Sequence, residues 1–445
     1  MIENNYPRIL IFGAPFNSFS GGGITLTNLF KGWPKEKIAV TSTGHVLQDV
    51  STDVCDVFYL LGRDEQKWRF PLNLFQKSFP SGLMKFSKNE SSDIQTLNIE
   101  SYRINIRQIL VDKLFYPLLH WFGLFHCLSE ISFSQNFKKW LDDYKPDILY
   151  LQVSSREDIL IAIQIFDYLS IPTVIHMMDD WPSTISRNGI LKKYWKKKID
   201  KEFRVLLNQM DLFLSISDAM SAEYKKRYDK DFIPFHNPID ISKFSEAGRD
   251  KNPGDKIFRI LYLGRIGVAN KHSISSFANA VSQHNTDSYK IELEIFTPGV
   301  NYRESKIIGS LDNVKILPPV GHQMVPALLT QYDLLLLPLD FTKLGFKYSQ
   351  YSIPTKASEY MISGTPIIVF APEETAISRF CSDNECGYCI TGDDEKRIHD
   401  GIDFLITNPE YRKKISNNAV ALATKLFDGN RVRKDFQRLI INLIK

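Results

Sequence analysis

The chain of 445 residues has few cysteines, no long apolar run and no strong excess of one charge. Its five cysteines are an odd number, which indicates a reducing compartment where thiols stay free. The formal net charge of +4 is small for a nucleic-acid-binding protein, so we expect no nucleic-acid partner. The longest apolar tract, 114–128, contains Pro117, His120 and His126 and is shorter than the roughly 18 residues that a membrane span needs.

The first residues lack the features of a signal peptide. Residues 1–16 hold Glu3 and no leading cluster of positive charge, and their apolar run, Ile9 to Phe12, has the length of a strand. No Asp-x-Asp pair follows a predicted strand as a metal site would require, so we expect neither a metal nor another cofactor. Together these absences predict a cytoplasmic protein that is soluble or peripheral to the inner face of the membrane.

Apolar residues make up 43% of the sequence, enough for two globular cores. They form short β-branched runs that alternate with segments of helical periodicity, a pattern typical of parallel sheets covered by helices on both faces. We therefore predict an α/β fold of two Rossmann-like domains with parallel sheets. The expected strands are 8–13, 38–42, 54–60, 147–153, 173–177 and 211–216 in the first half, and 258–264, 291–297, 314–317, 333–338 and 366–370 in the second.

A segment between the two halves, 234–253, is rich in Pro, Asn, Asp and Gly and has no periodic apolar pattern, which indicates a linker. We place the domain boundary near residue 248, so the predicted domains are 1–247 and 248–428. The last residues, 429–445, are predicted to form an amphipathic helix that packs back toward the first domain. Its apolar face is expected to contain Val432, Phe436, Leu439, Ile440 and Leu443.

Three turns that follow predicted strands are unusual, and parallel sheets bind ligands at the carboxyl ends of their strands. In the first turn, 18–25 (SFSGGGIT), three glycines precede a helix predicted from Ile24. The backbone amides of Gly22, Gly23 and Ile24 are expected to approach an anion there. A flexible turn without a ligand explains the glycines equally well, and the Gly-x-Gly-x-x-Gly fingerprint of dinucleotide sites is absent.

The second turn follows the first strand of the second domain and begins Gly264, Arg265. Lys271 stands a few residues later, directly before a helix predicted at 273–281. The planar guanidinium of Arg265 and the compact ammonium of Lys271 can converge on one diphosphate. The alternative interpretation is that both are solvated surface cations.

The third turn lies within 348–366 (YSQYSIPTKASEYMISGTP). Pro354 ends an extended stretch, and Thr355 can cap the helix that follows. Lys356 and Glu359 are three residues apart and share the first face of that helix. We expect the carboxylate of Glu359 to accept hydrogen bonds from ribose hydroxyls and the helix start to face phosphate. A plain capping role is the alternative for Glu359.

Six pieces of the sequence, taken in order, resemble the retaining glycosyltransferases of family 4, which have the two-domain GT-B fold. The pieces are SGGGIT, SISDAMSAEYKKRY, HNPIDISKF, YLGRIGVANK, VGHQMVPALLTQYDLLLLPL and SIPTKASEYMISGTPI. The resemblance covers nearly the whole chain and implies a nucleotide-sugar donor in a central cleft, with the acceptor entering from the first domain. It also implies that Gly22, Gly23, Arg265 and Lys271 hold the donor diphosphate.

The resemblance implies further donor contacts in the second domain. Gly321 and His322, and the loop at Gly299, would bind the nucleotide. The family often carries two glutamates eight residues apart, and Glu359 matches the second of them. Tyr351 stands at the first position, so the contact with the donor sugar departs from the family pattern.

A histidine in the first domain, His176 in VIHMMDDWP, stands at the carboxyl end of a predicted strand. The resemblance implies a catalytic role for His176, and we assign one to Asp179 beside it. The alternatives are a buried core histidine, with Asp179 or Asp180 acting only as the cap of the next helix.

Two segments of the first domain suit a lipid. Residues 192–204 (KKYWKKKIDKEFR) place Trp195, Ile199 and Phe203 on one helix face beside four lysines, which suits an anionic membrane surface. An ordinary surface helix packed by its apolar stripe fits the same pattern. The aromatic segment 110–128 is expected to receive a lipid-linked acceptor.

Together with the map of the three turns, the resemblance implies an enzyme that transfers a sugar, with retention, from a nucleotide-sugar donor such as a UDP-sugar to a glycan or lipid-linked acceptor. The product would belong to a cell-surface polysaccharide or glycoconjugate. One alternative is a nucleotide-sugar 2-epimerase of the same fold. Another is a non-catalytic nucleotide-sugar-binding homologue, for which Tyr351 is the main argument.

Overall fold

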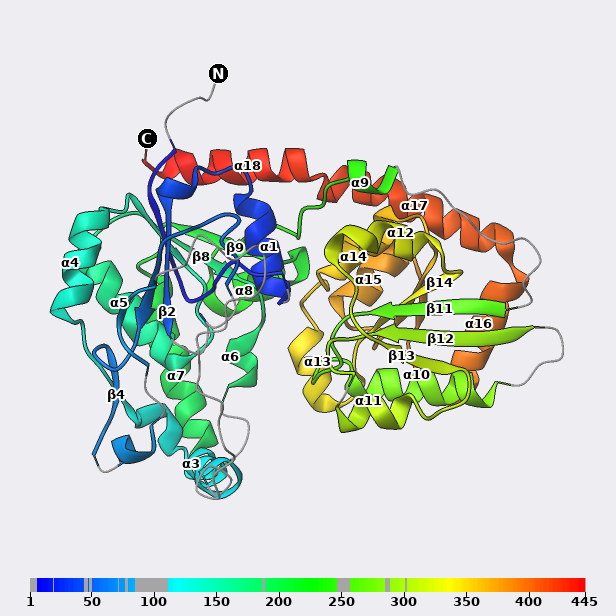
Figure 1. Cartoon of the computed structure of the whole chain (residues 1–445), viewed down its shortest axis with the longest axis horizontal. Helices are drawn as coiled ribbons and strands as arrows, with labels where there is room; N and C mark the ends of the chain where they lie inside the picture. The colour runs from blue at the N-terminus through cyan, green and yellow to red at the C-terminus, as the bar shows by residue number, and fades with distance from the viewer. Residues whose placement is uncertain are drawn as a thin grey trace. The chain divides into compact units, whose positions relative to one another are not determined.

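The computed structural model describes residues 6–18, 20–43, 47, 50–70, 72–76, 79–84, 111–185, 189–245, 257–284, 289–300 and 302–444. The chain divides into two compact units, Met1–Phe235 with Arg433–Lys445, and His236–Val432 (Figure 1). Each unit is built on a mainly parallel sheet with helices around it, which confirms the predicted α/β fold of two Rossmann-like domains. The predicted boundary near residue 248 lies outside the described residues.

The sheet of the first unit has the order β10-β9-β8-β7-β1-β2-β3-β5, and only the β3–β5 pair is antiparallel. All six strands expected in this half are present. Two short strands, β4 (Gln66–Trp68) and β6 (Ser129–Ile131), pair separately. The strands of the sheet are β1 (Ile9–Phe12), β2 (Ile38–Thr43), β3 (Phe58–Leu61), β5 (Gly82–Leu83), β7 (Ile148–Leu151), β8 (Thr173–Met177), β9 (Leu212–Ser215) and β10 (Ile233–Pro234).

Strands β1 and β7 are neighbours in space although far apart in sequence, and the turns that follow them meet closely. Gly13 ends β1 with φ +99°, and a Cβ at this position would lie 2.0 Å from the Gln152 carbonyl oxygen. Only glycine combines that backbone conformation with such a close approach. The turns after β1 and β7 are therefore held together at the carboxyl edge of the sheet.

Serine side chains start several helices of the first unit. Ser20, Ser134, Ser155 and Ser217 each accept a hydrogen bond from a backbone amide three residues later. This satisfies one of the amides that every helix start leaves unpaired. The helices are α1 (Gly21–Phe30), α3 (Tyr116–Trp121), α4 (Gln135–Tyr144), α5 (Arg156–Leu169), α6 (Trp181–Thr184), α7 (Lys192–Leu207) and α8 (Asp218–Tyr228), with a π-helix at Val111–Phe115 and a 3-10 turn at Leu124–Cys127.

The last long helix, α18 (Gly429–Ile441), ends within the first unit. The ring of Phe436 is completely buried and lies edge-on to Phe30 and Tyr150, at 5.2 and 6.2 Å between centroids. Gln437 accepts a hydrogen bond from the hydroxyl of Tyr6. The C-terminal part of the chain thus packs on the first half of the sequence, by the apolar face that its periodicity outlines.

The sheet of the second unit is entirely parallel and has the order β13-β12-β11-β14-β15-β16. This is the 3-2-1-4-5-6 order of dinucleotide-binding folds, in which the chain reverses direction across the sheet between β11 and β14. Alternate leucines of β14 enter two separate apolar cores, one on each face. The strands are β11 (Ile257–Leu263), β12 (Lys290–Phe296), β13 (Val314–Leu317), β14 (Leu334–Pro338), β15 (Ile367–Phe370) and β16 (Tyr388–Ile390).

The helices of the second unit differ from expectation near two turns. Helix α10 begins at Lys271, two residues before its predicted start, and α13 (Lys343–Ser349) lies ahead of the stretch that Pro354 ends. Gln350 still has helical φ and ψ, and residues 352–354 have no regular secondary structure. The helices are α9 (Ser242–Ser245), α10 (Lys271–Gln283), α11 (Arg303–Ile308), α12 (Val325–Thr330), α13, α14 (Lys356–Ile362), α15 (Ala376–Asp383), α16 (Glu395–Thr407) and α17 (Pro409–Phe427), with a 3-10 turn at His322–Met324.

Candidate functional site

The reversal point of the second sheet lies between the carboxyl ends of β11 and β14, where ligands of this architecture bind. The two turns that follow these strands are tied together. Asp340, after β14, donates its backbone amide to the carbonyl of Ala269 at 2.8 Å, and Ser273 donates its hydroxyl to the Leu339 carbonyl at 2.8 Å. The loop that carries Arg265 is thus anchored at its far end, at the start of α10.

A buried tyrosine, Tyr262, organises the near end of the same loop. Its hydroxyl donates to the Arg265 carbonyl at 2.6 Å and accepts from the side-chain amide of Asn270 at 2.7 Å. It also accepts from Nζ of Lys356 in α14 at 3.1 Å. One hydroxyl therefore joins the arginine turn to the lysine that the sequence places in the third turn. The sequence analysis did not single out Tyr262. The one feature that points to it is a tyrosine, with its polar hydroxyl, within an otherwise apolar strand.

The amine of Lys356 lies directly beside the arginine turn. It stands 4.2 Å from the centroid of the Tyr262 ring, and a Cβ at Gly264 would lie 2.3 Å from Nζ. Gly264 has φ +147°, so a side chain is excluded there by backbone conformation as well as by space. Burial lowers the pKa of Lys356 to about 7, with the nearby Glu359 carboxylate acting in the opposite direction. An anion bound beside the amine would raise the pKa of Lys356 and favour its charged form.

Glu359 is the second titratable group of α14. Burial raises its pKa to about 7, and Lys356 and Lys243 partly oppose the rise. His322 places Nε2 3.8 Å from the Glu359 carboxylate, and burial lowers the pKa of that histidine. The next residue, Tyr360, accepts a hydrogen bond from the Leu263 amide at 2.9 Å, which fixes α14 against the end of β11. Glu359 and His322, two residues that the resemblance assigns to the nucleotide, therefore lie close together in the second unit.

The start of α14 is not capped as expected. Thr355 is the residue before the helix, but its side chain makes no capping hydrogen bond. Its carbonyl accepts from the Asn237 side-chain amide at 3.3 Å, and the carbonyl of Pro354 accepts from the Ala357 amide at 2.8 Å. The backbone, rather than a threonine cap, therefore sets the entry into α14.

Lys271 and Arg265 are both solvent-accessible. Lys271 forms a 2.9 Å ion pair with Glu304 of α11, and both side chains are about half exposed. Such an exposed pair contributes less than about 1 kcal/mol, so a doubly charged diphosphate can displace it. Arg265 presents its carbonyl to the Tyr262 network while its side chain lies at the surface.

Two further glycines of the predicted donor site, Gly299 and Gly321, lie in turns that follow strands of the second sheet. A Cβ on Gly299 would lie 2.6 Å from the ring of Tyr302, so only glycine leaves room for the ring at this place after β12. Tyr302 is 67% exposed and offers an aromatic face to a ligand. Gly321 precedes the 3-10 turn of His322, and a side chain there would meet nothing within 4 Å.

In the first unit, the three glycines form the first turn of α1 instead of a loop before it. Gly23 donates its amide to the Ser20 hydroxyl at 3.1 Å, and Ile24 donates its amide to the Ser20 carbonyl at 2.9 Å. A Cβ on Gly23 would lie 2.3 Å from the Asn17 side chain, whereas one on Gly22 would meet only Met178, at 3.8 Å. Gly23 is therefore needed for packing, and the amides of Gly23 and Ile24 already have acceptors.

His176 does not face an accessible edge of the sheet. It is 1% exposed, its Nδ1 lies 2.5 Å from the Tyr150 hydroxyl, and burial lowers its pKa to about 3. His176 is therefore a neutral histidine of the protein core. Its place at a strand end does not make it accessible, because helices can cover the end of a strand. Asp179 is exposed after β8, whereas Asp180 is buried in a bidentate pair with Arg227, so neither side chain caps α6.

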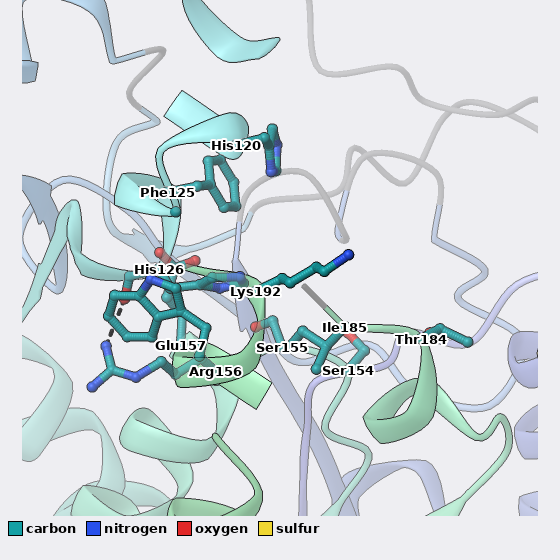
Figure 2. A pocket seen from close by; sticks show the side chains of 12 residues that line it. His120, Phe125, His126, Ser154, Ser155, Arg156, Glu157, Thr184, Ile185 and Lys192 are labelled. Carbon is teal, nitrogen blue, oxygen red and sulfur yellow. Dashed lines mark hydrogen bonds between the residues drawn. The ribbon is translucent and has the colours of Figure 1, made fainter. Parts of the chain in front are cut away.

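A pocket of about 420 Å³ lies within the first unit (Figure 2). Its walls come from the segment 120–126, from Ser154 to Glu157 after β7, and from the start of α7. His120 stacks on Phe125 at 4.3 Å, and Figure 2 shows the Lys192 side chain reaching into the space between these rings and the serines. The pocket has the size and the largely apolar lining of a small-molecule site.

Two features of this pocket bear on a ligand. The indole Nε1 of Trp195 is buried and has no hydrogen-bond partner in the described part of the chain. Burial lowers the pKa of His126 to about 4, so this histidine is neutral at physiological pH. The pocket therefore combines aromatic surface, an available donor and a cation at its mouth.

The amphipathic helix α7 uses its apolar face internally. Trp195, Ile199 and Phe203 are all at most 5% exposed, so they pack against protein and cannot enter a membrane. The lysines of the opposite face remain exposed. None of the helices in the described ranges is both long and apolar enough to cross a bilayer.

Known proteins were compared by sequence and by structure. Residues 257–408, about a third of the chain, match the family model for Glycosyl transferases group 1. No curated protein matches in sequence. Among the solved structures that share the fold are three whose alignments cover nearly the whole of both chains.

The first of these structures is HepE from Anabaena in complex with UDP and glucose, with a TM-score of 0.58 and 13% identity over 98% of this chain and 99% of that one. The second is sucrose-phosphate synthase from Thermosynechococcus elongatus, with a TM-score of 0.61 and 12% identity over 98% of each chain. The third is WaaG, a glycosyltransferase involved in lipopolysaccharide biosynthesis, with a TM-score of 0.55 and 12% identity over 96% of this chain and 99% of that one. The fold is the GT-B fold.

Proposed function

We propose that the protein transfers a sugar from a nucleotide-sugar donor, a UDP-sugar, to a glycan or lipid-linked acceptor, because residues 257–408 match the family model for Glycosyl transferases group 1. The observation that carries this proposal is the partly buried Lys356 amine, held by Tyr262 beside the arginine turn at the reversal point of the second sheet. Burial favours the neutral form of this amine, and a diphosphate beside it would favour the charged form. The UDP complexes of HepE support uracil as the base of the donor.

In the proposed donor site, Arg265, Lys271 and Lys356 surround the diphosphate. The ribose hydroxyls donate to the Glu359 carboxylate, and the base lies toward Tyr302 and the turn of His322. As the bond between the sugar C1 and the diphosphate breaks, negative charge grows on the leaving oxygen. Three cations gathered around that oxygen in the donor complex stabilise the growing charge and so lower the barrier.

Retention follows if the acceptor approaches from the side of the departing diphosphate. The acceptor oxygen then forms the new bond to C1, and its proton passes to an oxygen of the diphosphate. This route needs no carboxylate nucleophile, so it accommodates Tyr351 at the position of the family's first glutamate. We assign no metal to this reaction because the three side chains neutralise the diphosphate.

We assign the acceptor to the pocket of the first unit. Its aromatic rings and the unpartnered indole of Trp195 suit a sugar ring, and Lys192 suits a phosphate attached to it. The involvement of WaaG in lipopolysaccharide biosynthesis supports a product in cell-surface glycoconjugate synthesis.

The test is incubation of the purified protein with a panel of UDP-, GDP- and dTDP-sugars, with and without a lipid extract as acceptor. The sugar of each donor carries a label. UDP release that depends on the acceptor, together with labelled sugar appearing in the lipid extract, supports transfer. Isomerised donor formed without acceptor would support an epimerase instead. Donor binding by calorimetry with neither product would support a non-catalytic homologue.

A further inference from the structure

Large apolar side chains are exposed together at one place on the first unit. Leu114, Leu118, Trp121 and Phe122 follow the spacing of one helix face across the π-helix and α3, and all are between 45 and 57% exposed. Ile190, just before α7, is 66% exposed. A folded domain normally covers residues of this size, so a contiguous exposed set indicates an interaction surface.

The end of α3 and the start of α7 are joined, so these side chains form one surface. Ile190 donates its amide to the Trp121 carbonyl at 2.9 Å. Gly189 has φ +103°, and a Cβ there would lie 2.3 Å from the same carbonyl oxygen. A Cβ on Gly123 would lie 3.0 Å from the Leu191 side chain. Two glycines thus permit the close approach that places the apolar residues beside the first turns of α7.

The neighbouring part of α7 is strongly cationic. Lys192, Lys193, Lys196 and Lys197 are all exposed, and no acidic residue occurs in the helix before Asp200. Lys193, Lys196 and Lys197 also line a hollow of about 510 Å³. We call the apolar residues 114, 118, 121, 122 and 190, together with these four lysines, the α3–α7 face.

We propose that the α3–α7 face docks on the surface of a bilayer that contains anionic phospholipids. The apolar side chains enter the region between the lipid headgroups, and the lysines contact the lipid phosphates. Charge complementarity selects this occupant, because an apolar patch beside four uncompensated lysines suits a phosphate-rich surface better than a second copy of the same cationic face. Trp121 belongs to the residue type that favours the membrane interface.

This docking does not depend on the transfer reaction, but it gives the pocket of the first unit a source of acceptor. His120, Gly123 and Lys192 line that pocket and lie within or next to the α3–α7 face. A phosphate-linked acceptor anchored in the bilayer would therefore reach the pocket without leaving the membrane surface. The structure also moves the membrane contact from the buried stripe of α7, where the sequence suggested it, to α3.

The test is flotation of the purified full-length protein with vesicles of phosphatidylcholine alone or with about 30% phosphatidylglycerol. We expect binding only to the anionic vesicles, and weaker binding as salt is raised. Replacing two lysines, Lys193→Glu with Lys196→Glu, should weaken binding at least about 25-fold, since each lysine near such a surface contributes about fivefold. Trp121→Ser with Phe122→Ser should also lose binding.

A matched control replaces an exposed cation and an exposed apolar residue of the second unit, Lys306→Glu with Ile307→Ser. This control should float like the unmodified protein. All variants should keep the thermal unfolding midpoint and the UDP affinity of the parent, which separates docking from folding and from the donor site. Binding of the unmodified protein that ignores phosphatidylglycerol, or α3–α7 variants that float normally, would overturn the proposal. So would a dimer in solution that Trp121→Ser with Phe122→Ser converts to monomer while vesicle binding persists.

Discussion

From the surroundings of the Lys356 amine we predict how the affinity for UDP depends on pH. Its pKa is about 7 in the unliganded protein, against an ordinary value of 10.5, because of burial. A diphosphate beside the amine favours the charged form, so binding takes up a proton at any pH above 7. Each pH unit above 7 should then weaken binding by up to about tenfold, or about 1.4 kcal/mol. Because half of the amines are already neutral at pH 7, the loss from pH 7 to pH 9 approaches about 50-fold.

Glu359 adds an opposite dependence on the acidic side. Its pKa is raised to about 7, and only the carboxylate accepts two ribose hydrogen bonds, so affinity should also fall as the pH drops below 7. The parent protein should therefore bind UDP best near pH 7. Glu359→Gln should remove the acidic limb and keep the alkaline one, whereas Lys356→Met should remove the alkaline limb. His322 has a lowered pKa and does not change its charge above pH 7.

The assay is isothermal titration calorimetry of UDP between pH 6 and pH 9, repeated in two buffers of different ionisation enthalpy to count protons. Lys356→Met should also raise the unfolding temperature of the unliganded protein. A lysine whose pKa is depressed by folding destabilises the folded state at every pH below its ordinary pKa, and methionine removes that cost. Affinity that stays constant from pH 7 to pH 9, with no proton uptake, would refute this account of Lys356.

The other predictions concern the same site and the first helix. Arg265→Ala should lower kcat about 10²- to 10³-fold and Lys271→Ala about tenfold or more, both with unchanged unfolding temperature; full activity in either variant would contradict its role. Tyr262→Phe keeps the buried ring but frees the loop and the lysine, so KM for donor should rise and the alkaline limb of UDP binding should shift; a change in stability alone would mean a purely structural role. Gly23→Ala should destabilise the protein by about 1–3 kcal/mol in chemical denaturation, whereas Gly22→Ala, which meets no close atom, should not; equal effects would contradict the packing at this turn. Transfer should persist in excess EDTA, and a loss restored by a divalent cation would show that a metal takes part.

The sequence predicted the strands well because a strand buried on both faces is a short, continuous apolar run. Residues 333–338 were expected as a strand, and β14 is Leu334–Pro338. Helix starts were less predictable. Glycine favours loops in isolation, but the Ser20 cap draws Gly21, Gly22 and Gly23 into the first turn of α1.

The chemistry of the site depends on depth and on contacts between distant segments, which a sequence does not display. Lys356 and Tyr262 are 94 residues apart, and nothing local to either residue indicates their hydrogen bond. His176 has the same local pattern whether its strand end is open or covered. The stripe of α7 likewise fits a membrane or a protein core, and only the packing of Trp195 distinguishes the two.

The most direct measurement of the central claim is a crystal structure of the protein with UDP. We expect diphosphate oxygens within hydrogen-bonding distance of Lys356, with Arg265 and Lys271 turned toward them and the Lys271–Glu304 pair broken. A diphosphate bound elsewhere, with Lys356 still donating only to Tyr262, would contradict it.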